Sequence, residues 1–206
     1  MGSSVINHSC DQLYRLRLSL RLLETGDAED LANYLEHNRD FHGPWDIEHS
    51  AEYFHPVYWA NLLTENQFLY QEKRAVRIGC YIGQRLIGMC HIAQVLVEPI
   101  CQAEIGYHID TDHSRQGLMF EALCLLIPWA FHYFKLERLV ALVMLDNQPS
   151  QLLLKKLGFM QEGCLREYLL MRGQRVDHLL FALLREDLNH YRHFVSDCSR
   201  LDKPLE

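Results

Sequence analysis

A polar turn that contains one glycine, Asp112-His113-Ser114-Arg115-Gln116-Gly117, connects an apolar strand pattern to a long apolar helix pattern. The first N–H groups of a helix have no partner within the helix, and they carry the positive end of its dipole. A strand that leads into such a helix start can therefore bind an anion, and a pyrophosphate fits there. The alternative is that Gly117 only permits close packing. The Gly-x-Gly-x-x-Gly and Gly-Lys-Ser/Thr motifs are absent.

The elements that must position this turn follow from hydrophobic periodicity and from the placement of glycine and proline. Pro128 should kink the long helix, and Gly158 should end the short helix that follows. The sequence predicts strands near 16–22, 76–82, 86–95, 103–109, 138–143, 163–171 and 176–184, and helices near 25–35, 56–70, 118–134 and 147–157. This alternation of strands and helices predicts an α/β or α+β fold.

The chain has 206 residues and no repeat or linker, which predicts one domain over residues 1–206. Its core should span about residues 14–190, with loose ends at residues 1–13 and after Ser196. The seven scattered cysteines include no Cys-x-x-Cys pair, which is typical of reduced thiols in the cytosol. No apolar run is long enough to cross a bilayer and no signal peptide is evident, so we expect a cytoplasmic protein without membrane contact.

Charge and histidine content restrict the partners. The formal net charge of −7 argues against direct nucleic-acid binding and favours a cationic partner. Among the twelve histidines, only His190 and His193 have a spacing that resembles metal ligands, and no cysteine or carboxylate cluster accompanies them. We therefore expect no metal site.

Five short segments, taken together and in order, resemble the GNAT acetyltransferases, and within them the Rim-type ribosomal-protein N-acetyltransferases. The alanine-specific group of the Rim type is the most similar. The segments are Asn38-Arg39 with Pro44-Trp45, Ala-Glu-Ile-Gly-Tyr at 103–107, Gln-Gly-Leu-Met-Phe-Glu-Ala-Leu at 116–123, Asn-x-x-Ser at 147–150 and Lys-x-Gly-Phe at 156–159. The resemblance spans about residues 16–188. It implies the GNAT fold, in which a mixed, mostly antiparallel sheet of about seven strands is flanked by helices.

The same resemblance implies acetyl-CoA as co-substrate, bound where two parallel strands, here 103–109 and 138–143, splay apart. Backbone groups of Tyr107, His108 and Ile109 would hold the pantetheine arm. The pyrophosphate would lie on Ser114, Arg115, Gln116, Gly117, Leu118 and Met119, mostly on backbone N–H groups, and Asn147 would also contact the cofactor. Arg115 replaces a glycine that is common at its position. If a positive φ is required there, arginine would cost about 1 kcal/mol or more.

Acetyl transfer requires a neutral amine, a stabilised oxyanion and a place for the departing thiolate. Glu104 is the candidate general base, acting through a water molecule, and the alternative is an exposed strand carboxylate. A backbone N–H near Tyr107 or His108 would stabilise the oxyanion. Many relatives place a tyrosine at the position of Leu154, whereas the Rim type has a serine at the position of Ser150. Ser150 is thus the candidate partner of the thiolate, through a hydrogen bond or a proton relay, and the alternative is a residue in the first turn of a helix, where serine caps well.

Asn38, Arg39 and Trp45 lie in the segment that relatives use to shape the acceptor site, although Trp45 could equally be a core aromatic. The leading hypothesis is acetyl transfer to the α-amine of a protein or peptide N-terminus, with a ribosomal protein as candidate substrate. Two alternatives remain open: a small-amine or antibiotic N-acetyltransferase, and a non-catalytic acyl-CoA-binding protein. The sequence also leaves open whether the protein is a monomer or a homodimer.

Overall fold

The structure is a computed structural model that describes residues 17–191. The predicted loose ends lie outside the described residues, as do Leu16 of the first predicted strand and the side chains of the His190/His193 pair. The five cysteines within the described part are free thiols. No helix in the described part is both long and apolar enough to cross a membrane.

Seven strands form one sheet in the order β1-β2-β3-β4-β5-β7-β6. The strands are β1 Ser19–Leu22, β2 Val76–Ile82, β3 Arg85–Leu96, β4 Gln102–Ile109, β5 Arg138–Met144, β6 Met160–Met171 and β7 Gln174–Leu184. All neighbours are antiparallel except β4 and β5, which are parallel. The predicted mixed, mostly antiparallel seven-stranded sheet is therefore confirmed.

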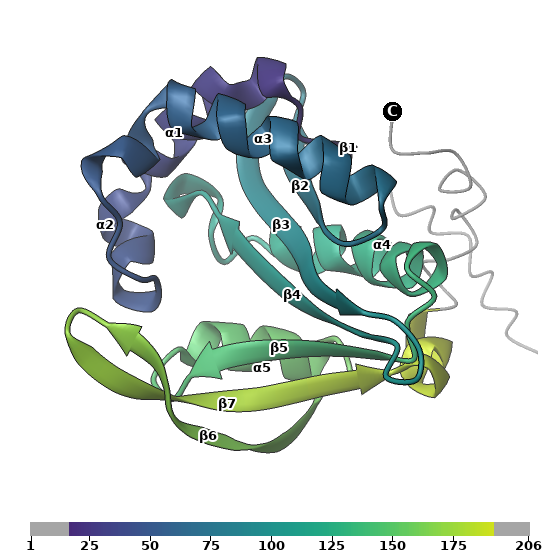
Figure 1. Ribbon diagram of the computed structural model, residues 1–206. Helices are drawn as coiled ribbons and strands as arrows, with labels where there is room; N and C mark the ends of the chain where they lie inside the picture. The colour runs from purple at the N-terminus through teal and green to yellow at the C-terminus, as the bar shows by residue number, and fades with distance from the viewer. Residues whose placement is uncertain (1–16, 192–206) are drawn as a thin grey trace, which may run out of the picture.

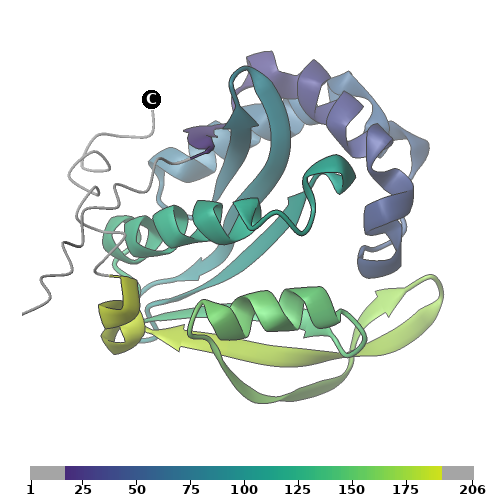
Figure 2. The ribbon, with the colours of Figure 1, turned by 180° about the vertical axis from the view of Figure 1, so that it is seen from behind.

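Helices cover both faces of the sheet (Figures 1 and 2). One face carries α1 Ala28–His37, α2 Arg39–His42 and α3 Pro56–Gln71, and the other carries α4 Leu118–Tyr133 and α5 Gln148–Lys156. Short 3-10 turns are η1 Thr25–Asp27, η2 Gly43–Trp45, η3 Ala51–Phe54, η4 Thr111–His113 and η5 Arg185–Tyr191. The predicted helices are thus present, and α4 continues through Pro128.

The apolar patterns form two clusters, one on each face. The larger cluster joins α4 to the sheet, with Leu123, Ile127 and Phe131 fully buried. The smaller one joins α1 and α3 to β2 and β3 through residues such as Leu31 and Leu63. Because burial of apolar area is the main stabilising term in folding, these clusters hold the helices against the strands that carry the site.

Glycines with positive φ lie at the turns that the sequence predicted. Gly83, at φ +60°, lies in the β2–β3 turn, and Gly158, at φ +86°, follows α5 as its predicted stop. Two strand starts differ from the prediction. Strand β1 begins at Ser19, after Arg17 and Leu18, rather than near residue 16. Strand β6 begins at Met160 rather than near residue 163, because polar side chains at the exposed sheet edge obscured the alternation there.

Candidate active site

The parallel strands β4 and β5 diverge after a short paired segment. Their register runs only from Gln102 and Arg138 to Glu104 and Val140. Beyond it, β4 continues to pair with β3 as far as Ile109, and β5 continues to pair with β7 as far as Met144. The predicted splay of the two strands is therefore present (Figure 1). Glu104 is the last β4 residue that pairs with β5.

The register with β3 shows which backbone groups of β4 face the opening. The N–H of Asp110 donates to the carbonyl of Ile87, and His108 pairs with Met89. Alternate residues of an antiparallel strand direct their backbone groups to opposite sides, so those of His108 face β3. Those of Tyr107 and Ile109 face the opening, but the Ile109 carbonyl already contacts His42 Nε2 at 2.8 Å. His108 is thus a poor candidate to hold the pantetheine arm through its backbone, whereas Tyr107 and the Ile109 N–H remain candidates.

Glu104 and Ser150 lie on opposite faces of β4. The side chains of Ala103 and Ile105 are buried in the α4 cluster, and Tyr107 packs against it and contacts Ser150. The residues between them must point to the α1 face, as His108 does through its contact with Tyr34. Glu104 is half-buried there and accepts a hydrogen bond from Gln94 Nε2 at 3.1 Å. Burial raises the pKa of Glu104 above its ordinary value, which makes the carboxylate a stronger base.

Ser150 is not the N-terminal cap of α5. Asn147 has that position, and its Oδ1 accepts the N–H of Ser150 at 3.1 Å. The Ser150 hydroxyl instead contacts the Tyr107 hydroxyl at 2.8 Å. Ser150 thus lies in the first turn of α5, as the alternative expected, but its side chain does not cap the helix. The side-chain oxygen of Asn147 is engaged in capping the helix, so any contact of its side chain with a cofactor would come from the amide nitrogen.

The predicted pyrophosphate turn has most of the expected free donors. Within residues 17–191, the backbone N–H groups of residues 115–119 donate to no protein acceptor that the structure gives. Ser114 differs, because its N–H and its hydroxyl both donate to the Thr111 carbonyl. The side chains of Leu118 and Met119 are buried, so only their backbone can face a ligand. The candidate anion site therefore comprises residues 115–119 and not Ser114.

The backbone of this turn is strained at Arg115, a position where the family that the sequence resembles commonly has a glycine, as expected if φ were positive there. Arg115 has φ +58° and is exposed, and Gly117, the N-cap of α4, has φ +78°. Arg17, which the sequence did not single out, contacts the same turn. Its guanidinium donates to the Gln116 carbonyl at 2.9 Å and pairs with Glu121 at 2.5 Å. No local motif marks Arg17, since the contact joins residues 99 positions apart.

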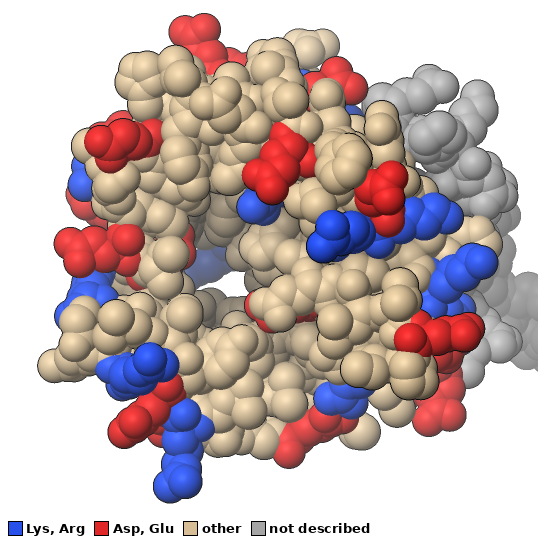
Figure 3. Space-filling model, in the orientation of Figure 1, with Lys and Arg blue, Asp and Glu red and all other residues tan. Residues whose placement is uncertain are grey.

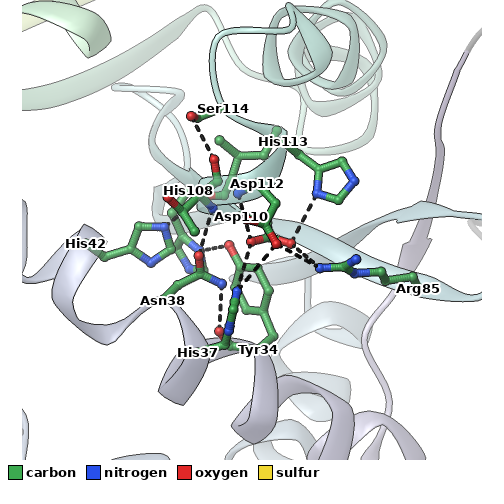
Figure 4. A network of polar contacts seen from close by, with 12 residues as sticks. Tyr34, His37, Asn38, His42, Arg85, His108, Asp110, Asp112, His113 and Ser114 are labelled. Carbon is green, nitrogen blue, oxygen red and sulfur yellow. Dashed lines mark hydrogen bonds and ion pairs between the residues drawn. The ribbon is translucent and has the colours of Figure 1, made fainter.

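A polar network fixes the segment between β4 and this turn (Figure 4). Asp110 is almost fully buried, and its carboxylate accepts hydrogen bonds from the N–H of Asp112 at 3.3 Å, from His113 at 3.1 Å and from Arg85 at 2.9 Å. Burial raises the pKa of this carboxyl, but these contacts, the Asp112 N–H first, outweigh burial and lower it. Asn38 donates to the Tyr34 carbonyl and accepts the N–H of Thr111, both at 2.8 Å. Network residues His37, Asp110 and Asp112 place one donor atom each within 4.8 Å of one another. Arg85 and His113 already contact the Asp110 carboxylate, so these contacts give the group a structural role in holding the segment.

Asn38 has a side chain that is 0% exposed, and both ends of its amide have protein partners. These are the contacts of a positioning residue, and contact of Asn38 with a substrate stays a prediction. Arg39 stays available: it is exposed, lies over the Phe54 ring and pairs with Glu36 at 3.8 Å. Trp45 is 39% exposed, so the alternative of a core aromatic is wrong. Contact of Arg39 or Trp45 with an acceptor stays a prediction.

Several neutral aromatic groups line the α1 face of β4, and the sequence did not reveal them. The Tyr34 hydroxyl contacts His108 Nδ1 at 2.8 Å, and the rings of His108 and His42 lie 4.9 Å apart. Burial lowers the pKa of both histidines and brings that of His91 on β3 to about 4. These imidazoles are therefore uncharged at neutral pH. Only the alternation with Glu104 along β4 could have indicated His108 as part of this face.

The α1 face of β4 is flanked by the segment that contains α1, α2 and η2 and by the β6–β7 hairpin (Figure 1). Arg172, at the tip of this hairpin, donates through Nη2 to the Gly43 carbonyl at 2.6 Å and so joins the hairpin to η2. Between these two parts the space-filling view shows an opening (Figure 3). This opening gives access to the α1 face of β4 (Figure 3), whereas the free N–H groups of residues 115–119 lie at the start of α4 on the other face of the sheet.

Comparison with known proteins agrees with this geometry. A model of the acetyltransferase (GNAT) domain matches residues 17–160. The chain is 34% identical over 174 residues to the [ribosomal protein uS5]-alanine N-acetyltransferase of Escherichia coli (strain K12), covering 83% of this chain and 89% of the relative. It is 32% identical over 170 residues to the probable N-acetyltransferase YjcK of Bacillus subtilis (strain 168), covering 82% and 94%.

Solved structures show the same fold. The ribosomal-protein-S5-alanine acetyltransferase from Vibrio fischeri superimposes with a TM-score of 0.80 at 28% identity, covering 83% of this chain and 94% of that one. Mycobacterium smegmatis RimJ, solved in complex with CoA-disulfide, has a TM-score of 0.80 at 24% identity, covering 89% and 90%. This likeness to RimJ concerns the fold alone.

The sheet, its splayed parallel pair and the donor-rich helix start define an acetyltransferase enzyme. Because the family model matches most of the chain, this protein belongs to the GNAT acetyltransferase family. Within that family it is an N-acetyltransferase similar to the ribosomal-protein-alanine N-acetyltransferases.

Proposed function

We propose that this enzyme transfers the acetyl group of acetyl-CoA to the α-amine of a protein N-terminus, with a ribosomal protein as substrate. The observation that carries the proposal is the placement of Glu104 and Ser150 on opposite faces of β4, next to the point where β4 and β5 separate. An amine on one face and a thioester on the other would meet in the opening between the strands.

Glu104 is proposed as the general base. An α-ammonium group has a pKa near 8, so a fraction of it is neutral at pH 7 and a modest base suffices. The half-buried carboxylate, whose pKa is raised by desolvation, would accept the proton through a water molecule. Its bond to Gln94 uses one oxygen and leaves the other for that water.

The oxyanion would be stabilised by the backbone N–H of Tyr107, which faces the opening, whereas that of His108 faces β3. Ser150 would donate a hydrogen bond to the leaving sulfur. Because serine is a weak acid, this role is stabilisation of the thiolate rather than outright protonation.

Charge favours a basic polypeptide as acceptor. The segment from Ala28 to Phe54, which covers the acceptor side of the site, contains seven carboxylates and a single arginine. It accounts for most of the formal net charge of −7. Such a field attracts a cationic chain and raises its association rate, with an effect that salt weakens. Relatives named for the ribosomal proteins they acetylate agree with this class of substrate.

The test is an acetyl-transfer assay with acetyl-CoA and three acceptors: a basic peptide with a free Ala N-terminus, the same peptide with a blocked α-amine, and a small primary amine. The proposal expects turnover of the first acceptor and little of the other two. Preferential turnover of the small amine would overturn the proposed acceptor.

Two variants test the roles of the residues. Glu104→Gln should lower kcat/KM by about 10²-fold or more, and Ser150→Ala by about tenfold, with acetyl-CoA affinity retained. Glu72→Gln makes the same chemical change on an exposed residue at the end of α3 and should behave as the wild type. Full activity of Glu104→Gln would refute its role as base.

A further inference from the structure

Tyr107 takes part in the proposed reaction through its backbone N–H, and its side chain makes a separate, specific contact in the site. Its hydroxyl lies 2.8 Å from the Ser150 hydroxyl, and the two residues come from β4 and α5, 43 positions apart. Tyr107 packs against the α4 cluster, and burial raises the pKa of its phenol far above the ordinary value. The phenol therefore stays protonated throughout the working pH range.

We propose that the Tyr107 hydroxyl is a positioning group that makes Ser150 a hydrogen-bond donor to the leaving sulfur; this inference rests on the proposed acetyl transfer. The geometry of this contact allows either hydroxyl to donate. Because a phenol is a better hydrogen-bond donor than an aliphatic alcohol, we assign Tyr107 as the donor and Ser150 Oγ as the acceptor. The hydroxyl of Ser150 has a single proton, and this proton must then point away from Tyr107. Donation from Tyr107 also polarises the Ser150 hydroxyl and strengthens its own donor capacity.

Without this contact, the serine has a competing partner. Ser150 occupies the third position of α5, where a serine hydroxyl can rotate to donate to the backbone carbonyl three or four residues earlier. A hydroxyl engaged in this way presents no proton to the sulfur. Tyr107 occupies one lone pair of Oγ and fixes the side chain in one orientation, while Asn147 fixes the start of the helix through the N–H of Ser150.

The step balances without a proton from Tyr107. The neutral amine forms the C–N bond, and its extra proton passes to Glu104 through water. Collapse of the tetrahedral intermediate breaks the C–S bond, and the electron pair goes to sulfur. Ser150 keeps its proton and hydrogen-bonds to the thiolate, which solvent protonates after release. Tyr107 remains a neutral phenol, as its raised pKa requires.

The arrangement also explains how this chain functions with Leu154 at the position where many relatives have a tyrosine. Leu154 is fully buried in the core and offers no polar group. The phenol is supplied instead from β4, and it acts through Ser150 rather than on the sulfur itself.

The experiment compares Tyr107→Phe, Ser150→Ala and the double variant, with kcat, KM and CoA dissociation constants measured for each. Tyr107→Phe keeps the ring and removes only the hydroxyl. We expect kcat to fall about five- to tenfold, since one neutral hydrogen bond corresponds to about fivefold in rate. The KM for acetyl-CoA and the affinity for CoA should stay within about twofold. Because Tyr107 acts through Ser150, the double variant should be no slower than Ser150→Ala.

The control is Tyr133→Phe, which removes a half-buried tyrosine hydroxyl that donates to the Tyr70 carbonyl at 3.1 Å near the end of α4. It should have wild-type kcat. Multiplicative losses in the double variant, or an unchanged kcat in Tyr107→Phe, would overturn the inference. So would a loss that appears only in CoA affinity, which indicates a purely structural role. The kcat ratios are read with whichever amine the wild type acetylates, so failure of the peptide substrate refutes only the proposed acceptor.

Discussion

Asn38 provides the sharpest test of how this structure holds its site, because the family resemblance and the structure assign it different roles. In Asn38→Ala the side chain loses two hydrogen bonds of 2.8 Å. The Tyr34 carbonyl keeps a partner, since the backbone N–H of Asn38 donates to it at 3.2 Å. The N–H of Thr111 loses the acceptor that the structure gives it. The loss of stability in Asn38→Ala therefore comes mainly from the unsatisfied N–H of Thr111.

An unsatisfied buried donor costs about 1–3 kcal/mol. For a domain of this size, each kcal/mol lowers Tm by about 2–4 °C, so a loss of 2 kcal/mol corresponds to about 4–8 °C. Thr111 begins η4, which leads directly into the turn that holds residues 115–119. We therefore expect Asn38→Ala to raise the KM for acetyl-CoA as well, because the turn is less well fixed, and to leave the KM for the acceptor nearly unchanged.

The assay is thermal unfolding together with steady-state kinetics in both substrates. Asn33→Ala is the matched control, because Asn33 is an exposed asparagine on the same helix. Asn38→Asp adds a second comparison: it keeps an acceptor for Thr111 but places an oxygen against the Tyr34 carbonyl, and it should be at least as destabilising as alanine. If Asn38→Ala keeps the wild-type Tm and raises only the KM for the acceptor, the reasoning is refuted and Asn38 binds substrate.

Three further predictions concern the turn, the hairpin and the base. Arg115→Gly should raise the free energy of unfolding by about 0.5–1 kcal/mol by removing a strained φ of +58°, whereas Arg115→Ala should not; equal stability in denaturant unfolding would contradict this. Both variants should weaken CoA binding equally if the guanidinium contacts phosphate, as titration calorimetry would measure. Arg172→Ala breaks the link to Gly43 and should raise the KM for the acceptor but not for acetyl-CoA, with stability within about 0.5 kcal/mol of wild type. For Glu104, kcat/KM should rise with pH through a pKa above the ordinary 4.5, because only the carboxylate is a base. Since that pKa is raised on folding, ionisation of Glu104 lowers stability as pH rises, and Glu104→Gln should be no less stable than wild type at pH 7; a clear loss of Tm would contradict this.

The sequence by itself determined the order and type of the elements, because periodicity, glycine and proline act within a few residues. It located the turn at residues 114–119, and the family resemblance marked Arg115 as a strained residue if its φ were positive, which the φ of +58° bears out. The motifs at 103–107 and 147–150 also nominated Glu104 and Ser150, since both lie within short segments that resemble the family.

Only the tertiary structure decided which side chains meet. The contacts of Tyr107 with Ser150, of Thr111 with Asn38 and of Arg17 with Gln116 join residues 43, 73 and 99 positions apart. No local pattern encodes such pairs, because they depend on how whole helices pack against the sheet. For the same reason the sequence did not show that Asn38 is buried and hydrogen-bonded to Tyr34 and Thr111. It also left open the face of Glu104, which the register of β4 with β3 and β5 determines.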